Sequence, residues 1–190
     1  MRAAIVVVIW GCWGAWALLW FAMAFSTKRT VEHPDRAWYA GAGLVVALVV
    51  VLRASHGLDG DSLRRALWTT SPVGDLVALA LVVGGLAFTA WARVTLGSNW
   101  SGSVVFKEDH ELVVAGPYAL ARHPIYTGLL AMLLGTAVAF PSPQSVGAFV
   151  AAVVVLWLKS QREEALMTRH FPDAYPAYRR RVRAIIPHVL

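Results

Sequence analysis

Cysteine and charged residues are both scarce in this chain of 190 residues, and each shortage excludes a class of protein. Cys12 is the single cysteine, which excludes disulfide frameworks and cysteine-rich metal sites. Only 15% of the residues are charged, whereas 58% are hydrophobic and the mean hydropathy is +0.58. A soluble domain of this size could not bury so much apolar surface. The composition therefore predicts an integral membrane protein.

Several motifs of well-known enzyme classes are also missing. The sequence contains neither a GxGxxG fingerprint nor a Walker phosphate loop, so any nucleotide is held in another way. It has no HExxH pair, and His110 lies 13 positions before His123. A metal held by these histidines with Glu163 and Glu164 is therefore the weaker interpretation, and we predict no metal site.

Long apolar runs are what the sequence does contain. A transmembrane helix needs about 20 apolar residues, and the runs predict an all-α integral membrane protein with five transmembrane helices. We expect one domain, residues 1–190, in which 1–92 hold the first three helices and 93–190 form the catalytic region. The predicted spans are Ala3–Phe25, Trp38–Leu52, Val73–Ala92, Ile125–Phe140 and Val146–Leu158, the last two forming a tight hairpin.

The first run has a second interpretation as a cleaved secretory signal. Arg2 precedes it, and Ala22-Met23-Ala24 resembles a cleavage site. However, the run is much longer than the roughly 7 to 15 residues of a signal core, and Lys28 and Arg29 follow it. A retained helix is the favoured interpretation.

The basic residues predict how the chain crosses the membrane. With five spans, 13 of the 17 basic residues fall on the side of the C-terminus. The positive-inside rule then places the N-terminus outside and the C-terminus in the cytoplasm, in the inner membrane. The net charge of +6 is explained by anionic lipids that attract Arg179, Arg180, Arg181 and Arg183. A short basic run beside a membrane helix does not suggest nucleic-acid binding.

The most informative polar segment runs from Lys107 to Gly128, between apolar runs. Pro124 suits the first turn of a helix, so Arg122 and His123 are expected just outside the N-terminus of the fourth span. Free N–H groups and the helix dipole favour an anionic group there. The alternative is that Arg122 and His123 only mark the interface by snorkelling.

A second polar cluster follows the fifth span. Glu163 and Glu164 are adjacent, and successive helical positions differ by about 100°. One carboxylate is therefore expected to face a ligand while the other faces Arg162, Arg169 or solvent; a solvated helix face is the alternative. Because this tail shares a side with the histidine-bearing loop, we expect the two to meet and form one cofactor pocket.

Three further features flank these clusters. Arg93 ends an uncharged run and is either a snorkelling residue or a cation that faces the substrate. Asn99 and Trp100 are placed to line an entry from lipid. Tyr175 and Tyr178 bring aromatic groups back to the interface, where an aromatic belt is the simpler explanation.

Taken together, four segments resemble the isoprenylcysteine carboxyl methyltransferase family and its bacterial relatives. They are LGSNWS at 96–101, HELVVAGPYALARHPIYTG at 110–128, REEAL at 162–166 and HFPDAYPAYRRR at 170–181. The likeness covers about the last hundred residues, and its specificity comes from the order and spacing of the motifs. Phe171-Pro172-Asp173 departs from the Phe-Gly usual in the family, so the resemblance does not imply the path of the tail after the helix.

The resemblance implies an integral membrane enzyme that uses S-adenosylmethionine. With the arguments above, it gives the expected catalytic residues Arg93, Arg162 and Glu163, and the expected substrate-binding residues Asn99, Trp100, Tyr175 and Tyr178. The expected cofactor-binding residues are His110, Leu112, Val113, Gly116, Tyr118, Arg122, His123, Tyr126, Gly128 and Glu164.

The leading hypothesis is methyl transfer from S-adenosylmethionine to a lipid-like or small hydrophobic acceptor. A membrane reductase of the sterol-reductase type, which would use NADPH, is the first alternative, and a non-catalytic membrane scaffold is the second. The acceptor stays open at this point, because a prenylated protein, a phospholipid amine, a small thiol and a hydrophobic carboxylate all suit the sequence.

Overall fold

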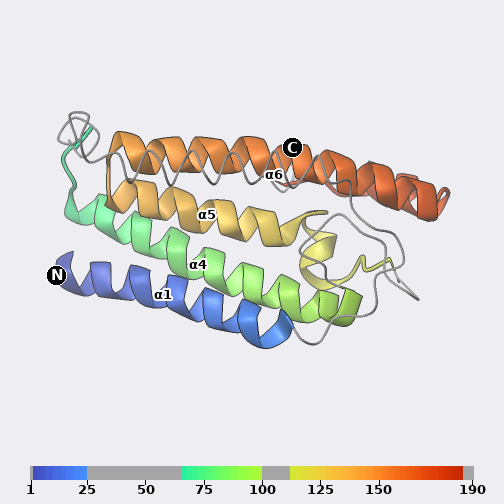
Figure 1. The fold of residues 1–190 in the computed structure, drawn as a ribbon, viewed down its shortest axis with the longest axis horizontal. Coiled ribbons are helices and arrows are strands. Elements are labelled where there is room, and N and C mark those ends of the chain that lie inside the picture. Colours follow the sequence, from blue (N-terminus) through green and yellow to red (C-terminus); the bar gives the residue numbers. More distant parts are fainter. Residues whose placement is uncertain (1, 25–65, 100–111, 186–190) are drawn as a thin grey trace.

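A computed structural model describes residues 2–24, 66–99 and 112–185, and every regular element in these ranges is helical. Four long helices lie side by side in the order α1, α4, α5, α6 (Figure 1). The elements are α1 (Arg2–Ala24), α4 (Pro72–Leu96), η1 (Gly97–Asn99), η2 (Gly116–Ala119), α5 (Pro124–Ala139), α6 (Pro143–His170) and α7 (Ala174–Arg181).

The four predicted spans that fall in the described ranges correspond to α1, α4, α5 and α6. Within the described residues, three helices are long and apolar enough to cross a membrane, namely α1, α4 and α6, and α5 is a shorter apolar helix. The predicted hairpin is present, because only the residues from Phe140 to Ser142 separate α5 from α6. The predicted second span, Trp38–Leu52, lies outside the described residues, so the count of five stays a prediction.

The last predicted span continues as a helix past its apolar run, as expected when Glu163 and Glu164 were placed on successive helical positions. The run Val146–Leu158 lies within α6, which has 28 residues and continues to His170. At about 1.5 Å per residue, its last turns extend well past an apolar core of about 30 Å. Hydropathy marks where the apolar surface ends, but the backbone hydrogen bonds continue into the polar segment.

The contact between α4 and α5 is so close that it depends on glycine. A Cβ atom on Gly85 would lie 2.5 Å from the carbonyl oxygen of Gly128, and one on Gly128 would lie 2.6 Å from that of Gly85. Further along, a Cβ atom on Gly135 would meet the carbonyl oxygen of Ala78 at 2.6 Å. Small residues let membrane helices approach in this way, since lipid gives no hydrophobic drive for association.

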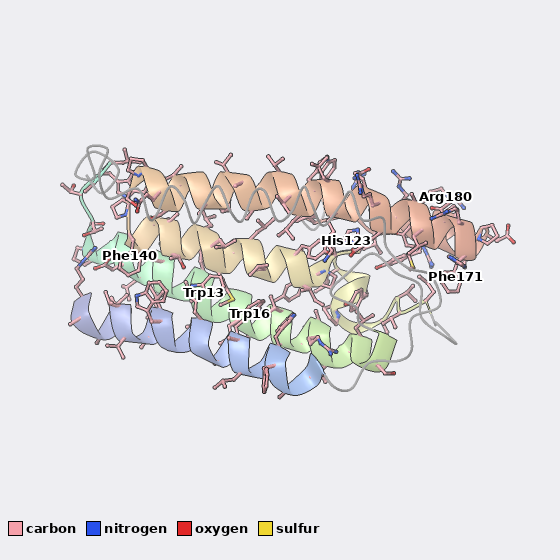
Figure 2. All side chains as sticks on the ribbon, in the orientation of Figure 1. Trp13, Trp16, His123, Phe140, Phe171 and Arg180 are labelled. Carbon is pink, nitrogen blue, oxygen red and sulfur yellow. The ribbon has the colours of Figure 1, made fainter. Side chains whose placement is uncertain are left out.

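Hydrogen bonds define two polar ends of the bundle. At the first, which we call the Arg2 end, Arg2 on α1 donates to Asp75 on α4 at 3.1 Å and to the Ala139 carbonyl of α5 at 2.9 Å. Helices α1 and α4 are therefore parallel and α5 is antiparallel to them. The opposite end, which we call the His123 end, holds the start of α5 and the end of α6. Figure 2 shows Phe140 toward the first end, and His123, Phe171 and Arg180 toward the second.

Candidate functional site

The turn before α5 runs from Gly116 to His123. Gly116 adopts φ +60°, a conformation that glycine reaches at little cost, and Gly116–Ala119 form the 3-10 helix η2. Pro124 occupies the first turn of α5, and His123 is the N-cap residue but makes no side-chain capping bond. The imidazole of His123 is therefore available to other partners.

Two adjacent glutamates of α6 are those partners. The Nδ1 atom of His123 lies 3.4 Å from Oε2 of Glu163, and its Nε2 atom lies 3.3 Å from Oε1 of Glu164. The expectation that one acid faces Arg162, Arg169 or solvent is thus wrong, because both carboxylates reach the same ring from opposite sides. The imidazole is wide enough to lie between two side chains that leave the helix in different directions.

Arg122 joins Glu164 to the C-terminal tail. Its Nε and Nη2 atoms donate to Oε1 of Glu164 at 3.0 and 2.6 Å. Its Nη1 atom donates to the carbonyl oxygens of Arg179 and Val182. The side chain of Glu164 is only 4% exposed, so this is a buried ion pair with additional hydrogen bonds. Such a pair is strongly destabilised when one partner is removed.

Glu163 makes a second set of contacts on the other side of His123. The hydroxyl of Tyr126 donates to its Oε1 atom at 2.6 Å, and Lys159 Nζ lies 3.9 Å from the same oxygen. The ring of Tyr126 stacks on that of His123, with centroids 5.3 Å apart and planes within 4°. His123 is therefore held by stacking as well as by both acids.

The acidic neighbours also change the charge of His123. Burial lowers its pKa, but the hydrogen bonds and charges of Glu163 and Glu164 outweigh this effect, so that the pKa lies above its usual value. The imidazolium form, which donates from both nitrogens, fits a ring between two carboxylates.

The tail returns across the start of α5, as the sequence predicted when it placed loop and tail on one side. We call residues 171–185 the strap. Backbone N–H groups of Arg122 and His123 donate to the carbonyl oxygens of Arg183 and Ala184, both at 2.8 Å. The hydroxyl of Tyr178 donates to the Tyr118 carbonyl at 2.6 Å. The strap is thus tied to η2 and to the start of α5 through backbone atoms.

Comparison with known proteins identifies relatives of this chain. A model of the phospholipid methyltransferase family matches residues 73–174. The chain is 32% identical over 174 residues to a probable protein-S-isoprenylcysteine O-methyltransferase from Oryza sativa subsp. indica, an alignment that covers 88% of this chain and 87% of that protein. It is 37% identical over 119 residues to the protein-S-isoprenylcysteine O-methyltransferase of Schizosaccharomyces pombe, covering 58% of this chain and 48% of that protein.

This chain belongs to the phospholipid methyltransferase family. It is therefore a membrane methyltransferase, and the reductase and scaffold interpretations are disfavoured. Among solved structures, the eukaryotic intramembrane Ras methyltransferase, an isoprenylcysteine carboxyl methyltransferase, aligns with a TM-score of 0.49 and 19% identity, covering 100% of this chain and 87% of that one.

Two arginines expected to act on the substrate lie apart from the cluster. Arg93 is fully buried and joins two helix ends in the methyltransferase, since it donates to the carbonyl oxygens of Gly97 and Met23, both at 2.7 Å. Arg162 is exposed, unlike its neighbours Glu163 and Glu164. Their catalytic roles stay predictions.

Other expected site residues fall into three groups. Tyr175 and Tyr178 are buried side chains of the strap, Tyr118 is buried in η2, and Leu112 and Val113 are half-buried before η2. Gly128 lies in the contact with α4, where a Cβ would lie 2.6 Å from a Thr89 side-chain carbon; this is a packing role, and its contact with the cofactor stays a prediction. The side chain of Asn99 is not described, and His110 and Trp100 lie outside the described residues.

The sequence argument missed three participants in the candidate site. Arg179 Nε lies 3.2 Å from Oε2 of Glu164, and Lys159 approaches Glu163. The carbonyl oxygens of the strap hold the Arg122 guanidinium. The position of Lys159, four residues before Glu163, was a usable signal because such residues share a helix face. Backbone carbonyls leave no signal in the sequence.

Proposed function

We propose that this methyltransferase uses S-adenosylmethionine and transfers its methyl group to a lipid-like or small hydrophobic acceptor that enters from the bilayer. The observation that carries the proposal is the buried cluster of Arg122, His123 and Glu164 at the end of a membrane helix bundle. It is assembled from the RHP and REE segments, two motifs on which the family resemblance rests.

The residues present fit the charges of this cofactor. Oε2 of Glu164 is buried and accepts no hydrogen bond from the described residues, although Arg179 Nε lies 3.2 Å away. A buried carboxylate oxygen without a hydrogen bond suits a ligand ammonium group, and the Arg122 guanidinium suits a ligand carboxylate. When bound, S-adenosylmethionine supplies an electrophilic methyl group.

The protein's contribution is then orientation and exclusion of water. Methyl transfer to an anionic or otherwise nucleophilic acceptor needs reactants held in line more than it needs acid–base help. His123 and Tyr126 are fixed by stacking and by Glu163, so they offer a rigid wall. The strap covers the cluster and reduces its contact with water, which strengthens the electrostatic interactions inside.

A lipid-like acceptor is supported by the relatives and by the position of the site. Two relatives are named for methyl transfer to protein-linked isoprenylcysteine, and the family model is named for phospholipid. The cluster lies where the apolar helices α5 and α6 give way to polar residues. We propose that Arg162, Tyr175 and Tyr178, with Asn99 and Trp100, contact the acceptor, and that Arg93 fixes the helix ends around it.

We also propose that the His123 end faces the cytoplasm and that the protein resides in the inner membrane. Among the described residues, nine lysines and arginines lie at the His123 end, and Arg2 lies at the other. Basic residues concentrate on the cytoplasmic side of membrane proteins.

Calorimetry tests the cofactor. The detergent-purified protein is titrated with S-adenosylhomocysteine and, separately, with NADPH. We expect saturable binding of S-adenosylhomocysteine and none of NADPH. Absence of S-adenosylhomocysteine binding at high micromolar concentration would contradict the proposal, and binding of NADPH alone would restore the reductase interpretation.

Isotope transfer tests the acceptor. The protein is incubated with methyl-labelled S-adenosylmethionine and a total membrane lipid extract, a panel of hydrophobic carboxylates, or small thiols. We expect label in lipid-like or small hydrophobic products. Label confined to protein would overturn the preference for a lipid-like or small acceptor while leaving methyl transfer intact.

A further inference from the structure

The strap has two faces with different chemistry. Its inner face consists of the buried rings of Tyr175 and Tyr178, together with the backbone carbonyl oxygens that hold Arg122 and His123. Its outer face carries a run of cations, because Arg180, Arg181 and Arg183 are all exposed. A short helix with buried aromatic residues on one side and arginines on the other is built to lie between protein and a charged surface.

The partner that fits this outer face is the anionic head-group layer of the surrounding bilayer. The strap is hydrogen-bonded to Arg122 and His123, which directly precede the apolar helix α5. The exposed arginines are therefore carried by a segment anchored at the place where the bilayer's apolar core ends. Each basic residue near an anionic leaflet contributes about 1 kcal/mol, which corresponds to roughly fivefold in affinity.

The same segment determines how well Arg122 and His123 are held. The Arg183 carbonyl accepts the Arg122 N–H, and the Ala184 carbonyl accepts the His123 N–H. Arg183, whose side chain belongs to the outer face, thus supplies one of these carbonyls itself. Lipid phosphates that bind the arginines would lower the free energy of the docked strap relative to an undocked one.

We propose that Arg180, Arg181 and Arg183 bind anionic phospholipid head groups, and that this contact holds the strap closed over the Arg122–His123–Glu164 cluster. The charge of the lipid leaflet then controls the fraction of molecules in which the strap is docked on the cluster. The lipid contact does not depend on the methyl-transfer chemistry, whereas its consequence for the cofactor rests on the proposed function.

Hydrogen exchange of the full-length protein tests the lipid contact. The protein is placed in nanodiscs of phosphatidylcholine with zero or about one third phosphatidylglycerol. We expect the amides of Arg122 and His123 to exchange at least about tenfold more slowly with the anionic lipid, within the roughly hundredfold limit of three arginines. The slowing should shrink as salt is raised toward 0.5 M, where the Debye length falls to about 4 Å.

Variants distinguish head-group binding from a general effect of lipid charge. The triple variant R180Q/R181Q/R183Q should lose the response, and R180K/R181K/R183K should keep most of it. Arg169→Gln, which removes an exposed cation in the last turn of α6, should respond as the unaltered protein does. Exchange that is indifferent to phosphatidylglycerol in the unaltered protein, or an unchanged response in the glutamine variant, would overturn the proposal. An equal slowing by inorganic phosphate in neutral nanodiscs would overturn the assignment to lipid.

A parallel titration separates this inference from the proposed function. S-adenosylhomocysteine should bind at least about threefold more tightly in the anionic nanodiscs than in the neutral ones, and the glutamine variant should lose that gain. If S-adenosylhomocysteine does not bind in either lipid while exchange still responds to phosphatidylglycerol, the proposed cofactor is wrong and the lipid contact stands. If it binds with equal affinity in both, the coupling of leaflet charge to the site is wrong.

Discussion

The two polar ends of the bundle use similar residues for different purposes. At the Arg2 end, one arginine joins three helix ends through Thr70, Asp75 and the Ala139 carbonyl. At the His123 end, Arg122, His123 and Arg179 surround Glu164, which keeps one buried carboxylate oxygen without a hydrogen bond among the described residues. The first end is a structural fastening. The second end keeps a buried carboxylate oxygen that can accept a further hydrogen bond, which is what a ligand site requires.

The largest expected effect comes from neutralising the buried acid at the His123 end. Glu164→Gln leaves Arg122 and the His123 imidazolium beside a neutral amide, and we expect the free energy of unfolding to fall by about 3 to 5 kcal/mol. Denaturation in mixed micelles measures it. We also expect S-adenosylhomocysteine to bind about 1 to 3 kcal/mol more weakly, as calorimetry would show.

Glu163→Gln is the matched control for that substitution, because its side chain is 23% exposed against 4% for Glu164. It should destabilise the protein less. If Glu163→Gln weakens S-adenosylhomocysteine binding and Glu164→Gln does not, the wrong acid has been assigned to the cofactor. If neither matters for binding, the His123 end is a fastening like the Arg2 end, and the comparison fails.

The next largest effect is expected at the Arg2 end. Asp75 is buried but its partner Arg2 is 46% exposed, so Asp75→Asn should cost only about 1 to 2 kcal/mol of stability. Because the Arg2 end lies at the far side of the bundle, S-adenosylhomocysteine affinity should not change. A loss of affinity in the folded Asp75→Asn protein would show that the two ends are coupled.

The difference between the ends explains what the sequence could and could not predict. Apolar runs predicted α1, α4 and α5, because a long run of apolar residues is visible directly in the sequence. Pro124 correctly predicted the start of α5, and therefore the position of Arg122 and His123. Apolar residues alone indicated only Val146–Leu158 of α6, and its continuation through Glu163 and Glu164 was expected from the polar residues that follow.

The arrangement inside the site was harder to predict than its location. Loop and tail were expected to meet, and they do. The convergence of Glu163 and Glu164 on one imidazole depends on the distance between α5 and α6. The close contact of Gly85 with Gly128 depends likewise on how two helices cross. The distance between α5 and α6 and the crossing of α4 with α5 both relate residues far apart in the sequence. Residue spacing within one helix therefore could not predict either of them.

A smaller effect should appear as coupling between residues at the same end. His123→Ala and Glu164→Gln each remove part of one network, so the double variant should weaken S-adenosylhomocysteine binding by less than the sum of the singles. The difference should be at least about 0.5 kcal/mol. The cycle of Glu164→Gln with Asp75→Asn should be additive in stability within about 0.5 kcal/mol, because these residues lie at opposite ends. Coupling of similar size in both cycles would contradict independent ends.

The smallest expected effect is a pH dependence of the protein's stability, which arises from His123 at the His123 end. The pKa of His123 is raised in the folded protein by Glu163 and Glu164 against the effect of burial, so the folded state binds the proton more tightly than the unfolded state. This stabilisation is fully present below the unfolded pKa of about 6.5 and is lost as pH rises through the higher folded pKa. The melting temperature in detergent should therefore fall across that window, and His123→Gln should remove the slope because it cannot titrate. Asp75→Asn, at the Arg2 end, should keep the slope of the unaltered protein. A slope that survives His123→Gln would assign the proton to another group and leave His123 as a neutral packing residue.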